Sequence, residues 1–234
     1  MKTTSMKTIG ILGGMSAAST ALYYQRLNAQ ARARLGGLHQ AELLIRSLDF
    51  AVIEQMQADG DWEAAGALLH REAQMLQDGG AKLLILATNT MHKVSERMTL
   101  DLRIPFLHIA DATAAAILNG GHTRPGVLAT AYTMEQDFYT GRLREAGLDP
   151  LVPDAEDRAE VHRIIYEELC HDVVRDDSRA RLVAIADRLG AAGADCLILG
   201  CTEVGMALTA ENAPLPVYDT TLIHCDMALE LALS

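Results

Sequence analysis

Two segments of this 234-residue chain repeat one arrangement of small, apolar and polar residues. Residues 80–90 read GAKLLILATNT, and residues 193–203 read GADCLILGCTE. Aligned on their first glycines, the segments place Thr88 opposite Cys201, and each is the first residue with a proton-carrying side chain after its apolar run. A hydroxyl and a thiol that face one space suit the removal of a proton from one side of a small molecule and its return on the other.

Cys201 lies between Gly200 and Thr202, where an apolar run meets the expected start of a helix. Backbone dipoles at such a position lower the pKa of a cysteine from about 8.5 toward neutrality, so we expect a reactive thiol. No C-x-x-C pair is present, and no cysteine or histidine spacing matches a zinc pattern, so neither a disulfide nor a metal ion is expected. The remaining cysteines are expected to be inert: Cys170, Cys196 and Cys225.

Two further segments are dense in residues that could contact a ligand. Residues 88–92 read TNTMH, which taken alone is also a reasonable helix cap. Residues 13–16 read GGMS and fit neither nucleotide-binding glycine motif. Their glycines could let the backbone approach a small anion, or they could simply form a turn from strand to helix.

Short apolar runs alternate with longer helical patterns, which is typical of βαβ units and a parallel sheet. Strands are expected at residues 8–12, 41–47, 83–87, 106–108, 126–129, 197–199 and 217–218. Helices are expected at residues 19–35, 62–78, 109–119, 134–146, 159–170 and 178–192. Ligands of open α/β sheets bind beyond the carboxyl ends of the strands, and Thr88 and Cys201 both lie at such ends.

The repetition extends beyond these two segments. Residues 9–13 (IGILG) resemble residues 125–129 (PGVLA) at an offset of 116, against 113 for Thr88 and Cys201. Near-equal offsets indicate a duplicated half. We therefore expect an α/β protein of two similar, pseudo-symmetric lobes, each a mainly parallel sheet flanked by helices, with the active site in the cleft between them. The expected N-terminal lobe is residues 6–104 plus 215–234, and the expected C-terminal lobe is residues 105–214.

Charge and hydropathy exclude several classes of partner. The formal net charge is -11, which argues against nucleic acid and against an anionic membrane surface. Half of the residues are hydrophobic but only 4% are aromatic, which is typical of α/β proteins. No apolar run reaches the ~18 to 20 residues of a membrane span, and the first residues lack the apolar stretch of a signal peptide. A cytoplasmic protein is expected.

Four motifs together resemble the aspartate/glutamate racemase family, and the likeness covers nearly the whole chain. They are residues 9–15 (IGILGGM), 88–92 (TNTMH), 166–169 (YEEL) and 200–203 (GCTE). In that family two catalytic cysteines face each other, and the resemblance places them at Thr88 and Cys201. Most members have cysteine where this chain has Thr88. With threonine at this position, the chain resembles the branch of the family described as broad-specificity or L-aspartate/glutamate-specific racemases.

The resemblance implies an isomerase that racemises an amino acid without pyridoxal phosphate or any other cofactor, and that forms a homodimer. By resemblance, Gln57 lies in a loop between Asp49 and Trp62 that closes over the substrate. The other residues expected to bind substrate are Met15, Asn89, Thr90, Glu168 and Thr202.

A threonine hydroxyl is a far weaker acid than a thiol. Proton transfer is therefore expected to be faster on one face of the α-carbon than on the other. Cys201 is the competent base in this interpretation. Thr88 delivers a proton or relays one through a water molecule, Glu168 or His92. Exchange of the α-proton should then favour one enantiomer.

The side-chain preference is left open by the sequence. Aspartate-specific relatives clamp the distal carboxylate with an arginine and a lysine, but the matching regions here read VIE at residues 52–54 and LCH at residues 169–171. Another base could substitute, namely Arg46, Lys93 or Arg163, or the substrate could be neutral, as homoserine is. The alternatives are an arylmalonate decarboxylase, a hydantoin racemase, a maleate isomerase, or a non-catalytic protein that binds an amino acid.

Overall fold

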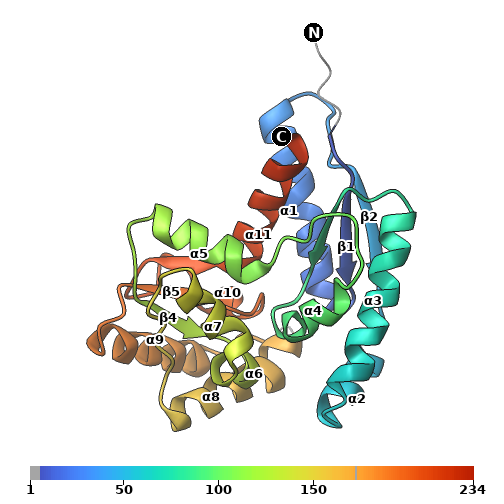
Figure 1. Cartoon of the computed structure of the whole chain (residues 1–234). Coiled ribbons are helices and arrows are strands. Elements are labelled where there is room, and N and C mark those ends of the chain that lie inside the picture. The colour runs from blue at the N-terminus through green and yellow to red at the C-terminus, as the bar shows by residue number, and fades with distance from the viewer. Residues whose placement is uncertain (1–5, 172) are drawn as a thin grey trace. The chain divides into compact units, whose positions relative to one another are not determined.

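The computed structural model describes residues 6–171 and 173–234, which form two compact units (Figure 1). The first unit contains residues 6–109 and His224–Ser234, and the second contains Ala110–Ile223. We expected residues 215–234 to lie together in the first unit. Residues 217–219 instead pair within the second sheet, so the chain returns to the first unit only at His224.

The first unit is built on a parallel sheet of three strands. These are β1 (Ile9–Gly13), β2 (Leu43–Ser47) and β3 (Leu83–Leu86), in the order β2-β1-β3. Residues 106–108, expected as a strand, contribute one parallel bridge, from Phe106 to Leu84. Every residue of β1 and β3 is buried, as expected for strands covered on both faces.

The second unit has a parallel sheet of the same size. Its strands are β4 (Pro125–Leu128), β5 (Cys196–Leu199) and β6 (Val217–Asp219), in the order β4-β5-β6. Leu151 forms a parallel bridge to Gly126 and extends the sheet beyond β4.

The two sheets repeat one pattern of pairing. β4 corresponds to β1, β5 to β3, and β6 to the bridge at Phe106. Gly10 pairs with Leu84 in the first sheet, and Gly126 pairs with Leu197 in the second. These partners are separated by the same offsets of 116 and 113 residues that align the sequence repeats. The predicted fold class, an α/β protein with two similar parallel-sheet units flanked by helices, is confirmed.

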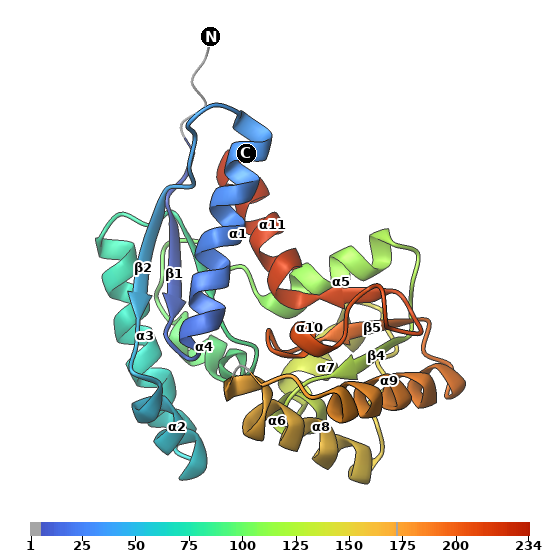
Figure 2. The same cartoon turned by 180° about the vertical axis from the view of Figure 1, so that it is seen from behind.

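Helices follow the strands in both units. The first unit contains α1 (Ala17–Leu35), α2 (Phe50–Ala58), α3 (Trp62–Asp78), the 3-10 helix η1 (Thr90–Val94) and α4 (Ser95–Met98). The second contains α6 (Ala131–Glu135), α7 (Asp137–Glu145), α8 (Ala155–Glu167), the 3-10 helix η2 (Leu169–His171), α9 (Asp176–Ala191) and α10 (Val204–Ala207). α5 (Ile109–Asn119) and α11 (Thr220–Leu233) each contain a unit boundary. In the first unit, α1 and α3 lie on opposite faces of the sheet (Figures 1 and 2).

Side-chain caps explain where several helices begin. Ser16, Asp49 and Asp61 each accept a hydrogen bond from a backbone N–H in the first turn of α1, α2 and α3. The expected helix at residues 134–146 is divided, because Gln136 is extended and separates α6 from α7. Among the helices that the structure describes, none is long and apolar enough to cross a membrane.

The turn after β1 depends on Gly14, whose φ is 92°. Its N–H donates a hydrogen bond to Thr20 Oγ1 at 2.8 Å, so this group is engaged within the fold. A Cβ on Gly14 would lie 2.1 Å from the backbone nitrogen of Leu48, which itself donates to the Gly13 carbonyl at 3.0 Å. The glycine is therefore required both by its conformation and by the close approach of the chain after β2.

We expect Gly14→Ala to lower the free energy of unfolding by roughly 3 kcal/mol, because backbone strain and a backbone clash add. Gly60→Ala is the matched control. Gly60 has φ of 72°, but a Cβ there would meet nothing within 4 Å, so a loss of only about 1 kcal/mol is expected. Urea denaturation measures the free energy of unfolding of both variants. Equal losses in the two would contradict the clash between a Cβ at position 14 and the backbone of Leu48.

Candidate active site

The first group of predicted site residues directly follows β3. Thr88 lies two residues beyond Leu86, and its N–H donates to the Leu86 carbonyl at 2.9 Å. η1 begins at Thr90. Thr88 is half-buried, and Asn89 and Thr90 are buried. The hydroxyl and amide groups of this segment are therefore held by a strand on one side and a helical turn on the other.

His92 fixes the backbone of Thr88. The N–H of Ile109 donates to His92 Nε2 at 3.2 Å, so this nitrogen carries no proton, and His92 Nδ1–H donates to the Thr88 carbonyl at 2.7 Å. Burial, with smaller effects of His108 and His224, places the pKa of His92 well below its usual value. Because both ring nitrogens are engaged by the backbone, the arrangement does not suit the proton relay expected of His92. Its role is to position Thr88.

His92 is part of a buried histidine cluster that the sequence analysis did not identify. Its ring centroid lies 4.4 Å from that of His108 and 6.0 Å from that of His224. His224 Nε2 lies 2.9 Å from the Leu107 carbonyl and must donate to it, so Nδ1 accepts from the Tyr23 hydroxyl at 2.8 Å. Burial lowers the pKa of His224 to about 4. His92 and His224 are therefore neutral near pH 7, and His224 ties α11 to α1 and to the segment before α5.

Gln57 lies in helix α2, whereas the sequence analysis expected a loop. The helix forms because the Asp49 carboxylate caps it, accepting from the N–H of Ala51 at 3.1 Å. Gln57 is buried, and its Nε2 donates to Met91 Sδ at 2.9 Å. Met15 and Met91 belong to the same buried hydrophobic cluster. The structure therefore places Gln57 against Met91, three residues after Thr88, and Met15 in the same buried cluster as Met91.

The predicted thiol follows the equivalent strand of the second unit. Cys201 lies two residues beyond Leu199, the last residue of β5, as Thr88 does beyond β3. Its Sγ donates to Glu203 Oε2 at 2.9 Å, and Thr202 Oγ1 donates to the same oxygen at 2.5 Å. Cys201 is half-buried and Glu203 is buried. A single carboxylate oxygen of Glu203 thus accepts hydrogen bonds from both the Cys201 thiol and the Thr202 hydroxyl.

The pKa of Cys201 is raised well above its usual value, which reverses our expectation. Burial is the largest cause, followed by the negative charge of Glu203 and the hydrogen bond to it. The expected helix dipole is weak, because α10 begins only at Val204 and has four residues. In the structure Cys201 is a protonated thiol.

Glu168 is the carboxylate of the second unit that was expected to contact substrate. It is buried, and its pKa is lowered by hydrogen bonds from Ser178 and Arg163 that oppose the effect of burial. Arg163 Nη1 donates to its Oε1 at 2.8 Å, whereas its Oε2 has no hydrogen-bond partner among the described residues. Glu168 is therefore a buried anion, and its Oε2 has no hydrogen-bond partner among the described residues.

Two of the three bases that could hold a distal carboxylate are already paired with carboxylates. Arg46 donates to buried Glu72 at 2.6 Å, and Arg163 pairs with three glutamates. Lys93 differs, because its ammonium lies 3.7 Å from the centroid of the Trp62 ring, and burial lowers its pKa. Lys93 is the remaining candidate of the three.

The neutral histidines make stability depend on pH. Below pH 6.5 the unfolded chain protonates His224, whereas the folded chain does so only near pH 4. The free energy of unfolding should therefore fall as the pH drops through this range, by up to roughly 3 kcal/mol from His224. Urea titrations across the range should show a shallower dependence for His224→Gln, and an unchanged dependence for the exposed control His39→Gln. A slope identical in His224→Gln and the parent protein would contradict the assignment.

Comparison with known proteins places this arrangement in a family. A family model described as Asp/Glu/Hydantoin racemase matches residues 12–228. A Yersinia pestis protein, described as a candidate Asp/Glu racemase, is 45% identical with a TM-score of 0.93 over 98% of this chain and 100% of its own. An aspartate racemase homologue from Pyrococcus horikoshii is 34% identical, with a TM-score of 0.87 over 98% and 100%.

A more distant structure shares the fold alone. The aspartate racemase of Picrophilus torridus is 19% identical, with a TM-score of 0.76 over 97% of this chain and 94% of its own. The family model, in contrast, spans all six strands except the first three residues of β1. The chain belongs to the Asp/Glu/hydantoin racemase family.

Proposed function

We propose that this protein racemises amino acids without a cofactor, by exchange of the α-proton between Thr88 and Cys201. The observation that carries the proposal is their equivalence. Each residue lies two positions beyond the corresponding strand of a repeated sheet, and one carries a hydroxyl where the other carries a thiol. Racemisation needs proton donors and acceptors on both faces of the α-carbon, and a duplicated fold supplies two such positions.

Glu203 gives Cys201 a route between its two protonation states. The thiol proton can move along the 2.9 Å hydrogen bond to Glu203 Oε2, which leaves a thiolate that removes the α-proton. In the opposite direction, Thr88 removes the α-proton after its own hydroxyl proton has passed to solvent, the protonated thiol supplies a proton to the carbanion, and solvent restores the thiol proton through Glu203. Because the pKa of Cys201 is raised, the donor state dominates before substrate binds.

Thr88 would supply the proton on the other face. Its hydroxyl is a poor acid, so we propose that it donates only as negative charge develops on the substrate, and that the proton taken up by Glu203 then returns through solvent to the Thr88 oxygen. Asn89 and Thr90 follow it and would donate hydrogen bonds to the substrate carboxylate, which becomes enediolate-like. Thr202 would add a third donor, from the second unit.

The arrangement of charges favours a broad set of substrates. We propose that Glu168, whose buried Oε2 has no hydrogen-bond partner among the described residues, accepts a hydrogen bond from the α-ammonium group of the substrate. Arg46 and Arg163 are neutralised by carboxylates, so neither is well placed to select a second substrate carboxylate. We propose that aspartate, glutamate and neutral amino acids of similar size, such as homoserine, are all candidate substrates, with Lys93 the remaining cation.

Incubation in heavy water with each enantiomer of the common amino acids, followed by chiral chromatography and mass spectrometry, tests the proposal. We expect α-deuterium exchange that is faster from one enantiomer than from the other, because thiol and hydroxyl are unequal bases. Cys201→Ala should lower exchange from both enantiomers by at least about 100-fold. Thr88→Cys should make the two directions more nearly equal.

The same experiment separates the alternatives. Release of carbon dioxide from a malonate substrate without amino-acid exchange would indicate a single-thiol decarboxylase, which the loss of the second cysteine at Thr88 permits. Binding of an amino acid without exchange, with activity gained in Thr88→Cys, would indicate a non-catalytic binding protein. Full exchange in Cys201→Ala would remove the thiol from the mechanism.

Glu203→Gln tests the coupling of the carboxylate to the thiol. Loss of the negative charge should lower the pKa of Cys201, so the rising limb of the kcat/KM profile should move to lower pH by roughly one unit. The maximal rate should fall, because an amide in place of the carboxylate cannot take the thiol proton. Glu211→Gln, an exposed change in the same unit, is the control. A pH profile that does not move in Glu203→Gln would separate Glu203 from the proton transfer.

A further inference from the structure

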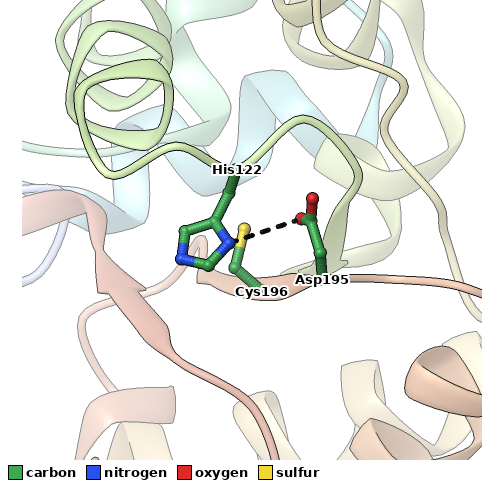
Figure 3. Close-up of side chains that lie close together, drawn as sticks. All are labelled: His122, Asp195 and Cys196. Carbon is green, nitrogen blue, oxygen red and sulfur yellow. Dashed lines mark ion pairs between the residues drawn. The ribbon is translucent and has the colours of Figure 1, made fainter.

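A second group of chemistry-bearing side chains lies at the start of β5, at the opposite end of the strand from Cys201. It consists of His122, Asp195 and Cys196, whose Nδ1 or Nε2, carboxylate oxygen and Sγ atoms all lie within 4.8 Å of one another (Figure 3). His122 Nδ1 lies 4.0 Å from Asp195 Oδ1. No function is assigned to these residues by the racemase motifs.

The fold holds this cluster in place. The Asp195 carboxylate accepts from the N–H of Thr123 at 2.8 Å and from the N–H of Arg124 at 3.0 Å. These bonds fix the loop that carries His122 against the first residues of β5. The ring of Tyr218, on the neighbouring strand β6, meets the His122 ring edge to face, with centroids 5.8 Å apart. The three side chains therefore face one another before any ligand arrives.

The donor set has a clear chemical preference. An imidazole, a carboxylate and a thiolate are the three side-chain ligand types of zinc sites, whereas magnesium and calcium prefer oxygen alone. A dication bound by one thiolate and one carboxylate is electrically neutral. This would stabilise a thiolate at Cys196, which is fully buried, and would leave no uncompensated charge there.

We propose that His122, Asp195 and Cys196 bind a zinc-type divalent transition-metal ion, with solvent as the fourth ligand. Ligand atoms of a tetrahedral zinc site lie roughly 3.3 to 3.8 Å apart, so the cluster closes by about 1 Å when the ion binds. His122 and Asp195 are half-buried, with side-chain exposures of 25% and 37%, so the ion and its water reach the site from solvent. The backbone N–H groups of Thr123 and Arg124 donate to the Asp195 carboxylate and orient it toward the ion.

The metal would serve the fold and not the proton exchange. β5 has four residues, so the cluster and Cys201 lie at opposite ends of a strand roughly 13 Å long. The ion would join the loop before β4 to the first residues of β5, in addition to the hydrogen bonds of Asp195. The inference is independent of the proposed racemase activity.

Titration of the metal-free full-length protein with zinc by calorimetry, and with cobalt by absorption spectroscopy, tests the site. We expect one ion per chain with a Kd on the order of 10 μM or tighter, a thiolate-to-cobalt charge-transfer band, and a higher Tm with zinc. Cys196→Ser should abolish the charge-transfer band. His122→Gln should weaken binding at least about tenfold.

The controls distinguish this cluster from the other thiols and imidazoles. Cys170→Ser and His39→Gln change exposed residues and should leave the affinity and the cobalt band unchanged. Substitution of Asp195 would also remove its hydrogen bonds to two backbone N–H groups. A change at the half-buried ligand His122 disturbs the fold less, and circular dichroism checks that His122→Gln folds. Absence of one-to-one binding, or binding that survives His122→Gln and Cys196→Ser unchanged, would overturn the proposal and leave a cluster held by hydrogen bonds alone.

Discussion

The register of the parallel strands is the constraint on which the rest of this structure depends. Gly10 pairs with Leu84 and Gly126 pairs with Leu197, so each unit brings the same strand to the same position beside its neighbour. A shift of one residue would turn every side chain of β3 or β5 to the opposite face. Thr88 and Cys201, which follow these strands, owe their equivalent positions in the two units to this pairing.

Within that common frame, the two units stabilise their reactive groups in different ways. Thr88 is held by its backbone, through the N–H to Leu86 and the carbonyl to His92. Cys201 is held by its side chain, through Glu203. The hydroxyl is thus carried on a fixed backbone, whereas the thiol has a carboxylate base at 2.9 Å. The repeat preserves the pairing of the strands, whereas burial and the side chain of Glu203 raise the pKa of Cys201.

Much of the fold could be predicted from the sequence because strand patterns and duplication are local signals. The offsets that align Gly10 with Gly126 also give the correct register. Helix α2 was missed because it has only nine residues, and the division at Gln136 depends on one extended residue. Neither produces a strong periodic pattern.

The placement of Thr88 and Cys201 after equivalent strands could be predicted from the sequence, whereas the acidity of the thiol could not. Thr88 and Cys201 were expected after equivalent strands, but the direction of the Cys201 pKa shift depends on burial and on the side chain of Glu203. The cluster at His122 joins the loop before β4 to the start of β5, and the histidines at 92, 108 and 224 are likewise distant from one another in sequence. Spacing alone cannot reveal such groups.

The raised pKa of Cys201, caused first by burial and then by Glu203, affects how the thiol reacts with oxidants. Peroxides and alkylating agents attack the thiolate, and a thiol that stays protonated at rest reacts slowly with both. Threonine at position 88 cannot be oxidised to a sulfenic acid or join a disulfide. The chain therefore has no oxidisable thiol at position 88, and its thiol at position 201 reacts slowly with peroxides and alkylating agents while it stays protonated.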